Sequence, residues 1–281
     1  LVTLLVLTFV LSSFSVGFAA DTAEKLPTEV VRAQALGILK GDAKGNLNLD
    51  KPITRAEALA LIIRISGLEA SSELMKGQTK FADANADPGL QWATGYINLG
   101  VGQKIINGFP DGTFKGNNQV TYAEMGKMLL YAMNYGVTVE GAPWPAGVMG
   151  KADDLKLFDK VNALPNVPAL RGDVVKMIDN SLTVKHLKQT GYGDFKQYEE
   201  VEDSFLSKMD VTELKDERVT AVDAKKARVT IAKKAYKVLA DADIEGLLGM
   251  EVDAWANDDD EIFFIDPDMD SVKVDLVKED V

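Results

Sequence analysis

The chain of 281 residues contains no cysteine, so disulfide cross-links and cysteine-based zinc or redox sites are excluded. Histidine is almost as scarce, because His186 is the only one. A two-histidine metal site is therefore excluded, and a serine–histidine catalytic pair would have only this residue to use. The polar residues around His186 predict a solvated position in a linker.

A surplus of positive charge is also missing, since the formal net charge is −12. Residues 241–281 hold 15 acidic residues against two lysines, a balance of −13, so the residues before them sum to +1. Without a net basic surface to release counterions, a nucleic-acid partner is disfavoured. The nearly neutral remainder could approach an anionic polymer without strong repulsion.

Residues 1–20 are uncharged and end in the small-x-small pattern Gly17-Phe18-Ala19. They predict a secretory signal peptide cleaved after Ala19 or Ala20, whose own methionine and basic start are missing. The alternative is a membrane anchor that stays attached, although the apolar run is short for a span.

The stretch from 107 to 130 combines a turn with a capped helix. Phe109–Gly112 has proline at the second turn position and glycine at the fourth, which is typical of a type I turn. Thr121 and Glu124 form a capping box, and Val120 and Met125 can form a hydrophobic staple. A helix is therefore predicted to start at Thr121.

The same pattern returns 67 residues upstream without a gap. Gly41 and Gly45 repeat the turn glycines, and Thr54 and Glu57 repeat the capping box. A third, weaker copy at 167–182 lacks both the turn and the capping box. Repeats of this kind bury a core that one copy cannot bury alone.

Four motifs of the second copy fit one family pattern in order: FAD at 81–83, WA at 92–93, IINGFPDGTF at 105–114 and TYAE at 121–124. They resemble the S-layer homology domain, a module that anchors bacterial surface proteins to the cell wall. The first copy keeps ITRAE at 53–57 but lacks the aromatic-x-Asp opening. The second has Tyr122 in place of arginine, and the third is degenerate.

The resemblance spans about residues 26–185 and implies a mainly α domain with pseudo-threefold repeats. In that fold three central helices carry loop-rich prongs, between which a polymer binds. We expect an α+β multidomain protein, with the following segments: repeats at 26–69, 78–136 and 143–185, a linker at 186–210, and a small β-rich domain at 211–281.

The β-rich domain is predicted from an alternation of period two that begins near Val211. The pattern indicates a hairpin closed around Asp223–Lys226 and a strand at Glu261–Pro267. We expect a barrel or a sandwich, cut short at Val281.

Arg55 and its counterpart Arg171 are the most informative candidates for a ligand site. Arg55 is predicted at the first helical position, where the helix dipole disfavours a cation, so another interaction should compensate. One reading is that Arg55 and the helix N-terminus bind an anion together. The other is that Arg55 pairs with a carboxylate of a neighbouring repeat, and both can hold in different grooves. Arg171 keeps the charge but lacks a threonine cap beside it.

The resemblance implies that the ligand is secondary cell-wall polysaccharide, associated with peptidoglycan and often pyruvylated. The candidate contact residues are Arg55, Glu57, Asp83, Trp92, Asp111, Tyr122, Glu124 and Arg171. Trp92 could stack on a sugar, but its helical spacing with Tyr96 and Leu99 favours a place in the core. Asp83 and Asp111 could contact ligand, cap a helix or close a turn. Tyr122 predicts a silent or altered groove.

Asp266, Asp268 and Asp270 alternate as at the start of a calcium loop, but the glycine and the terminal glutamate of such a loop are missing. A solvated acidic face is the favoured reading, so no cofactor is expected. Paired carboxylates cannot nominate a glycosidase in so acidic a chain, and no other pattern indicates an enzyme.

Together these patterns predict an exported cell-surface protein that is held non-covalently on the wall polymer. Two alternatives stay open: a structural subunit that assembles laterally into an S-layer or filament, and the anchor of a surface hydrolase truncated before its catalytic domain.

Overall fold

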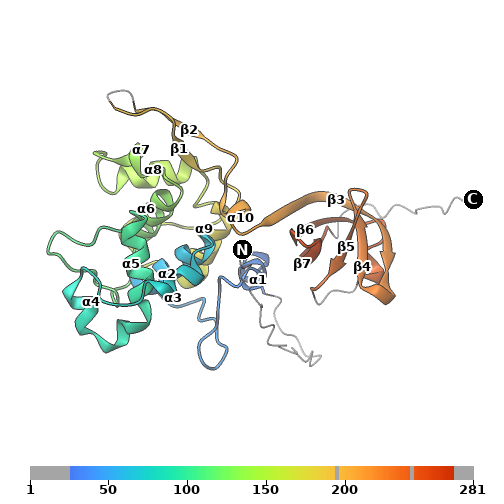
Figure 1. Ribbon diagram of the computed structural model, residues 1–281, viewed down its shortest axis with the longest axis horizontal. Helices are drawn as coiled ribbons and strands as arrows, with labels where there is room; N and C mark the ends of the chain where they lie inside the picture. The colour runs from blue at the N-terminus through green and yellow to red at the C-terminus, as the bar shows by residue number, and fades with distance from the viewer. Residues whose placement is uncertain (1–25, 194–195, 241–243, 269–281) are drawn as a thin grey trace, which may run out of the picture.

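The computed structural model describes residues 26–193, 196–240 and 244–268, so the expected signal peptide lies outside it. A helical part is followed by a small β-barrel, which confirms the α+β class (Figure 1). Within the described ranges, no helix has the length and apolar character needed to cross a membrane.

Each repeat contributes a pair of helices in the same order. The first helix of each pair is α1 (Thr28–Ala35), α5 (Thr94–Gly102) or α8 (Ala146–Asp154). The second is α2 (Arg55–Ile65), α6 (Tyr122–Ala132) or α9 (Arg171–Ser181), and all three have 11 residues. Short elements fill the connections: α3 (Glu69–Leu74), α4 (Ala82–Ala86), the 3₁₀ helix η1 (Pro88–Ala93) and α7 (Gly136–Val139).

The second helices form the centre of the helical part. All but three residues of α2 are buried, as expected for a helix that is apolar on nearly every face. The predicted capping boxes are present at Thr54 and Thr121. Leu170, at the matching position before α9, makes no side-chain cap.

The three residues that precede these helix caps are joined in a closed ring of backbone hydrogen bonds. The amide of Ile53 donates to the carbonyl of Ala169 at 3.1 Å, that of Ala169 to Val120 at 2.9 Å, and that of Val120 to Ile53 at 3.1 Å. All three side chains are fully buried. The ring therefore brings the N-termini of α2, α6 and α9 together.

Two loops leave this ring, and we call residues 40–52 prong 1 and residues 107–119 prong 2. Their turns are closed by equivalent bonds, from Gly45 N to Asp42 O at 2.8 Å and from Gly112 N to Phe109 O at 2.9 Å. Both glycines have a positive φ, 83° and 78°, which explains why glycine recurs there. Prong 1 projects as the long blue loop of Figure 1.

The segment expected to be a solvated linker is folded onto the helical part instead. β1 (Leu187–Gln189) pairs with β2 (Tyr198–Glu200) in an antiparallel hairpin, and the short helix α10 (Phe205–Lys208) follows. His186 is only 1% exposed and packs edge-on against buried Phe205, so the prediction of a solvated histidine is wrong. Burial lowers the pKa of His186 to about 4, and the cation of Lys208 acts in the same direction.

The C-terminal region is a closed five-stranded barrel with the order β3-β4-β5-β7-β6. The strands are β3 (Val211–Asp223), β4 (Arg228–Ile231), β5 (Lys234–Val238), β6 (Glu251–Asn257) and β7 (Glu261–Pro267). Neighbours are antiparallel, except that β5 and β7 are parallel. The predicted hairpin, closed by η2 (Ala224–Lys226), and the predicted last strand are both present.

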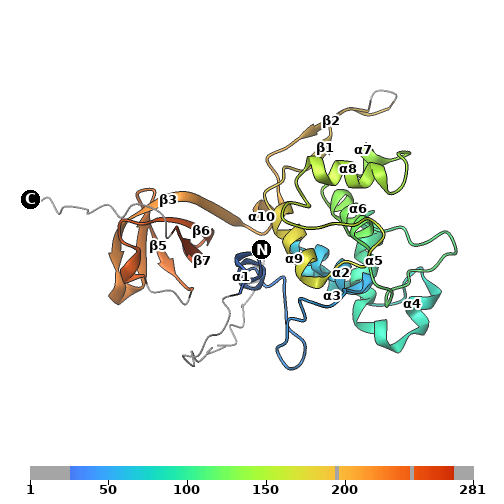
Figure 2. The same ribbon diagram turned by 180° about the vertical axis from the view of Figure 1, so that it is seen from behind.

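Helix α1 connects the barrel to the rest of the molecule. Its Arg32 forms an ion pair with Asp179 of α9 and lies 5.3 Å from the ring of Trp255 and 5.9 Å from that of Phe264. These aromatic residues belong to β6 and β7. In both views α1 accordingly lies between the barrel and the central helices (Figures 1 and 2).

Candidate functional site

The first residue of each central helix meets a carboxylate from the first turn of a neighbouring one. Two of the contacts are ion pairs, Arg55 Nη1 to Glu124 Oε1 at 4.0 Å and Arg171 Nη1 to Glu57 Oε1 at 3.6 Å. The third is a hydrogen bond from Tyr122 OH to Asp173 Oδ2 at 2.5 Å. The reading in which Arg55 pairs with a neighbouring repeat therefore agrees with this geometry. The Arg55–Glu124 ion pair is longer than a hydrogen bond, so the guanidinium of Arg55 can still donate hydrogen bonds to another group.

The groove at Arg55, which we call groove 2, has a volume of about 390 Å³. One wall is residues 105–110, which lead into prong 2, and the other is α6 with Glu124, Lys127 and Tyr131. Trp144 completes the lining. Lys127 Nζ lies 5.7 Å from the ring of Tyr131 and 5.6 Å from that of Trp144, so a cation lies close to two aromatic faces.

Arg55 is the first residue of α2, as predicted, and its side chain is only 11% exposed. The guanidinium lies over the rings of Phe109 at 5.0 Å and Phe114 at 5.4 Å. Burial lowers the pKa of Arg55 although Glu124 opposes this shift. Its Nε is buried without a hydrogen-bond partner in the described part of the chain. An unsatisfied buried donor is costly, so the position favours an added acceptor.

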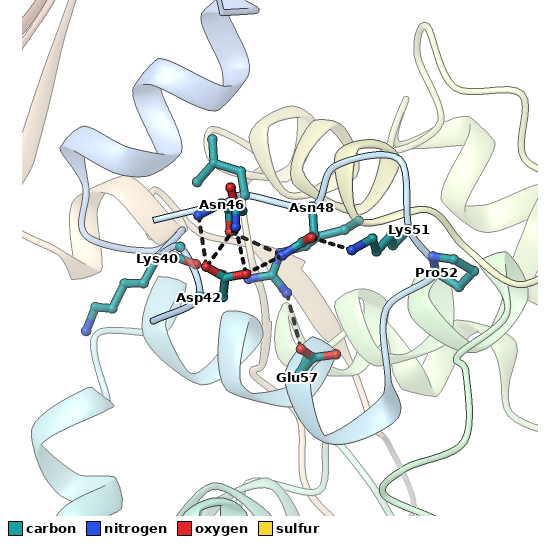
Figure 3. A pocket seen from close by; sticks show the side chains of 10 residues that line it. Lys40, Asp42, Asn46, Asn48, Lys51, Pro52 and Glu57 are labelled. Carbon is teal, nitrogen blue, oxygen red and sulfur yellow. Dashed lines mark hydrogen bonds and ion pairs between the residues drawn. The ribbon is translucent and has the colours of Figure 1, made fainter. Parts of the chain in front are cut away.

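Groove 1 lies at Arg171 and has a volume of about 330 Å³ (Figure 3). Prong 1 supplies Asn46, Asn48 and Lys51, and α2 supplies Glu57. Arg171 also donates to the backbone carbonyl of Lys40 at 3.3 Å, and burial lowers the pKa of its guanidinium. Groove 1 is therefore more polar than groove 2 around the same kind of arginine.

The aspartates of the prongs accept hydrogen bonds from the backbone of their own turns, and Asp42 also lines groove 1. Asp111 accepts from the amide of Thr113 at 3.0 Å, and side-chain and backbone bonds lower its pKa to about 2. Asp42 does the same in prong 1 through Lys44 and Asn46, and its pKa is also lowered to about 2. Sequence reasoning missed Asp42 because the aligned position in the second copy is Phe109.

Asp83 ties α4 to prong 2. Its carboxylate accepts from the backbone amides of Phe114 at 3.0 Å and Lys115 at 2.8 Å, and these bonds lower its pKa. The residue thus fixes the base of prong 2, which positions one wall of groove 2.

The two tryptophans Trp92 and Trp144 are both exposed but lie in different places. Trp92 is 44% exposed and packs edge-on against Tyr96, so the prediction of a core residue is wrong. It does not line either groove, whereas Trp144 lines groove 2. Trp144 lies 52 residues after Trp92, the same offset that separates α8 from α5, and this spacing could have revealed it.

The third position differs from the other two. Tyr122 is 4% exposed and donates to Asp173, and burial together with this carboxylate raises the pKa of Tyr122 to about 12. The loop before α9 has a turn closed from Val161 N to Phe158 O at 2.9 Å, with valine where prongs 1 and 2 have glycine. Tyr122 and Asp173 thus satisfy each other and fill the position that an arginine holds elsewhere.

The calcium candidates are only partly described. Asp266 lies in β7, where it accepts from the hydroxyl of Thr28 at 3.5 Å, Asp268 follows the strand, and Asp270 lies outside the described residues. No group of three histidine or acidic side chains able to hold a metal gathers within 26–193, 196–240 and 244–268.

Comparison with known proteins agrees with the repeats. The profile of the S-layer homology domain matches residues 25–59 and 80–125. The chain is 36% identical over 194 residues to the "Middle cell wall protein" of Brevibacillus brevis, which covers 68% of this chain and 18% of that protein. It is also 36% identical over 198 residues to the "Surface layer protein" of Brevibacillus choshinensis, covering 68% of this chain and 17% of that protein.

A more distant relative is the "Cellulosome-anchoring protein" of Acetivibrio thermocellus, 29% identical over 101 residues, or 36% of this chain and 22% of that protein. The chain thus spans less than a quarter of the length of these relatives. Paired helices, prongs and matching motifs define a repeat protein of the bacterial cell surface. The chain belongs to the S-layer homology family, and its location is the cell wall or cell surface.

Proposed function

We propose that the helical part anchors this protein non-covalently to secondary cell-wall polysaccharide, which lies in grooves 1 and 2. The observation that carries the proposal is Arg55, a buried guanidinium with a long ion pair and an Nε that has no partner among the described residues. An acidic sugar would supply the missing acceptor.

A carboxylate such as a pyruvate ketal suits both arginines, because a guanidinium can bind it through two parallel hydrogen bonds. In groove 2, Trp144 and Tyr131 offer aromatic faces on which a sugar ring could pack, and Lys127 adds a second cation. In groove 1, the amides of Asn46 and Asn48 and the ammonium of Lys51 offer polar contacts to sugar hydroxyls. The same anion would thus be held in two different surroundings.

The anchor has an approximate threefold arrangement in this proposal. Its support is the backbone ring of Ile53, Val120 and Ala169 and the cyclic contacts between first-turn residues of the three central helices. Only two of the three positions would bind polymer, because Tyr122 and Asp173 fill the third.

Lateral assembly into a surface layer is the second candidate, and the name of the Brevibacillus choshinensis relative favours it. The third candidate is a role as the anchor of a hydrolase, and the described residues form no catalytic constellation that supports it. The proposed role of this chain itself is binding, not catalysis.

Sedimentation with cell walls tests the proposal. The purified chain should co-sediment with peptidoglycan that carries its secondary polymer, and walls stripped of that polymer by acid should not retain it. Equal retention by both preparations would contradict polymer binding. Ordered sheets or filaments formed without wall polymer would favour lateral assembly.

A further inference from the structure

The barrel has a connectivity associated with ligand binding. Its long first strand, β3, pairs with both β4 and β6, and the third and fifth strands, β5 and β7, are parallel. The 3₁₀ helix η3 (Glu245–Leu247) lies between β5 and β6 and contributes Leu247 to the barrel core. This is the strand order of the OB fold, whose second and third strands and the loops beside them bind oligosaccharides or oligonucleotides.

The corresponding surface here is the outer face of β4 and β5. Residues 224–238 contain six cations and no acidic residue, within a chain whose net charge is −12. All six are exposed: Lys225, Lys226, Arg228, Lys233, Lys234 and Lys237. The net charge of +1 for all residues before 241 does not reveal this basic segment. We propose that this outer face, which we call the basic face, binds a polyanionic glycan of the cell wall.

The strand register places Arg228 and Lys237 on the outer side of the sheet, whereas Lys234 lies opposite buried Ile231 and on the same side as Tyr236. Arg228 lies directly opposite Lys237, while Val229 and Tyr236, the next pair, point into the barrel. The turn at η2 places Lys225 at one end of the strands, and the two-residue turn of Ala232 and Lys233 lies at the other end. A glycan lying along the strands would therefore meet cations at both ends of this face.

Neighbouring carboxylates neutralise only part of this charge. Lys226 pairs with Asp223 at 3.1 Å and Lys237 with Glu261 at 2.9 Å, and Lys234 pairs with Asp260. Lys225, Arg228 and Lys233 have no carboxylate partner within 4.0 Å in the described part of the chain. These three side chains are available to carboxylates or phosphates of a ligand.

The other side of the barrel is already occupied. The outer residues Trp255 of β6 and Phe264 of β7 pack against Arg32 of α1 and are almost fully buried. In Figure 1, β4 and β5 accordingly lie on the side of the barrel remote from α1. The basic face is thus turned outward while the helical part is held by the wall. Because the protein lies at the cell surface, an acidic glycan is the favoured polyanion over a nucleic acid.

The test uses the full chain with Arg55→Met and Arg171→Met, so that grooves 1 and 2 do not contribute. Polygalacturonate serves as the acidic glycan, dextran as the neutral glycan and oligo-dT as the nucleic acid. Titration calorimetry measures the binding of each probe at two salt concentrations. We expect salt-sensitive binding to polygalacturonate and none to dextran. Adding Lys225→Gln, Arg228→Gln and Lys233→Gln should weaken that binding roughly tenfold, since three exposed charge contacts are lost.

The matched control adds Lys156→Gln, Lys160→Gln and Lys188→Gln, which remove three exposed cations from the helical part and should leave the affinity unchanged. Melting curves on each variant confirm that the fold is kept. Absence of polygalacturonate binding, or equal weakening in the control, would overturn the proposal. Tighter binding to oligo-dT than to polygalacturonate would overturn the choice of a glycan. Because both grooves are disabled throughout, none of these results depends on the proposed anchoring site.

Discussion

The two arginine positions and the tyrosine position occupy equivalent places in the helical part but reach opposite outcomes. Arg55 is buried against aromatic rings, its carboxylate partner is 4.0 Å away, and one of its donors is unused. Tyr122 makes a short hydrogen bond to Asp173. In the proposed anchor, the position whose polar groups satisfy each other is structural, and the one that keeps an unmet donor binds the ligand.

Removing both arginines should give the largest effect. Charge-assisted hydrogen bonds contribute about 1.5–3 kcal/mol each, so Arg55→Met with Arg171→Met should lower polymer affinity by roughly a hundredfold or more. Methionine keeps the apolar packing of the side-chain stem. Co-sedimentation with polymer-bearing walls measures the loss, and Lys188→Met serves as a control on an exposed residue. If polymer-bearing walls retained the double variant fully, the arginine positions would not differ from the tyrosine position in polymer binding.

Tyr122→Phe tests the opposite side of the comparison. It removes the hydrogen bond to Asp173 and leaves that carboxylate without the hydroxyl, which should cost roughly 1–2 kcal/mol of the free energy of unfolding. Urea unfolding should therefore show a lower midpoint, while polymer affinity stays at the wild-type value. A weaker affinity in a folded Tyr122→Phe protein would mean that the third position also binds ligand.

Alkaline pH should reduce the difference in the free energy of unfolding between wild type and Tyr122→Phe. The pKa of Tyr122 is about 12 in the folded protein, against about 10 in an unfolded chain. Between these values the unfolded state releases the proton and the folded state keeps it, so the contribution of Tyr122 to stability falls as pH rises from 10 toward 12. Urea unfolding of wild type and Tyr122→Phe at pH 9, 10 and 11 measures the gap. A gap that stays constant would show that this hydroxyl does not titrate as described.

The smallest effect concerns the missing cap of the third repeat. Leu170 has the extended backbone of an N-cap residue but no side-chain acceptor, so Leu170→Thr should stabilise α9 by about 0.5–1 kcal/mol. The reciprocal Thr121→Ala should cost about 1 kcal/mol. Thermal melting of both variants checks the pair. A loss of stability in Leu170→Thr would show that the leucine side chain contributes packing that outweighs a cap.

Local patterns carried much of the fold. The capping boxes at Thr54 and Thr121, the turn at Phe109–Gly112 and the last strand at Glu261–Pro267 depend on residues close together in the chain, and the structure contains all of them. Such features need only short-range hydrogen bonds and alternation, which a sequence displays directly.

Features that depend on distant partners were not predictable in the same way. His186 is buried because Phe205 and α10 fold back over it, although its neighbours in sequence are polar. Trp92 has helical spacing toward the core but ends exposed, while Trp144 reaches groove 2 from another repeat. The long Arg55–Glu124 pair likewise joins two repeats, so residues close together in the sequence could not reveal it.

Titration of purified secondary wall polysaccharide into Arg55→Met and Arg55→Lys tests the central claim most directly. With groove 1 intact, binding isotherms should resolve a loss of about tenfold at groove 2 for Arg55→Met. Arg55→Lys should recover only part of it, because an ammonium lacks the planar fork of the guanidinium. Melting curves on the same samples exclude unfolding as the cause. A folded Arg55→Met protein that binds the polymer with unchanged affinity at both grooves would contradict the account.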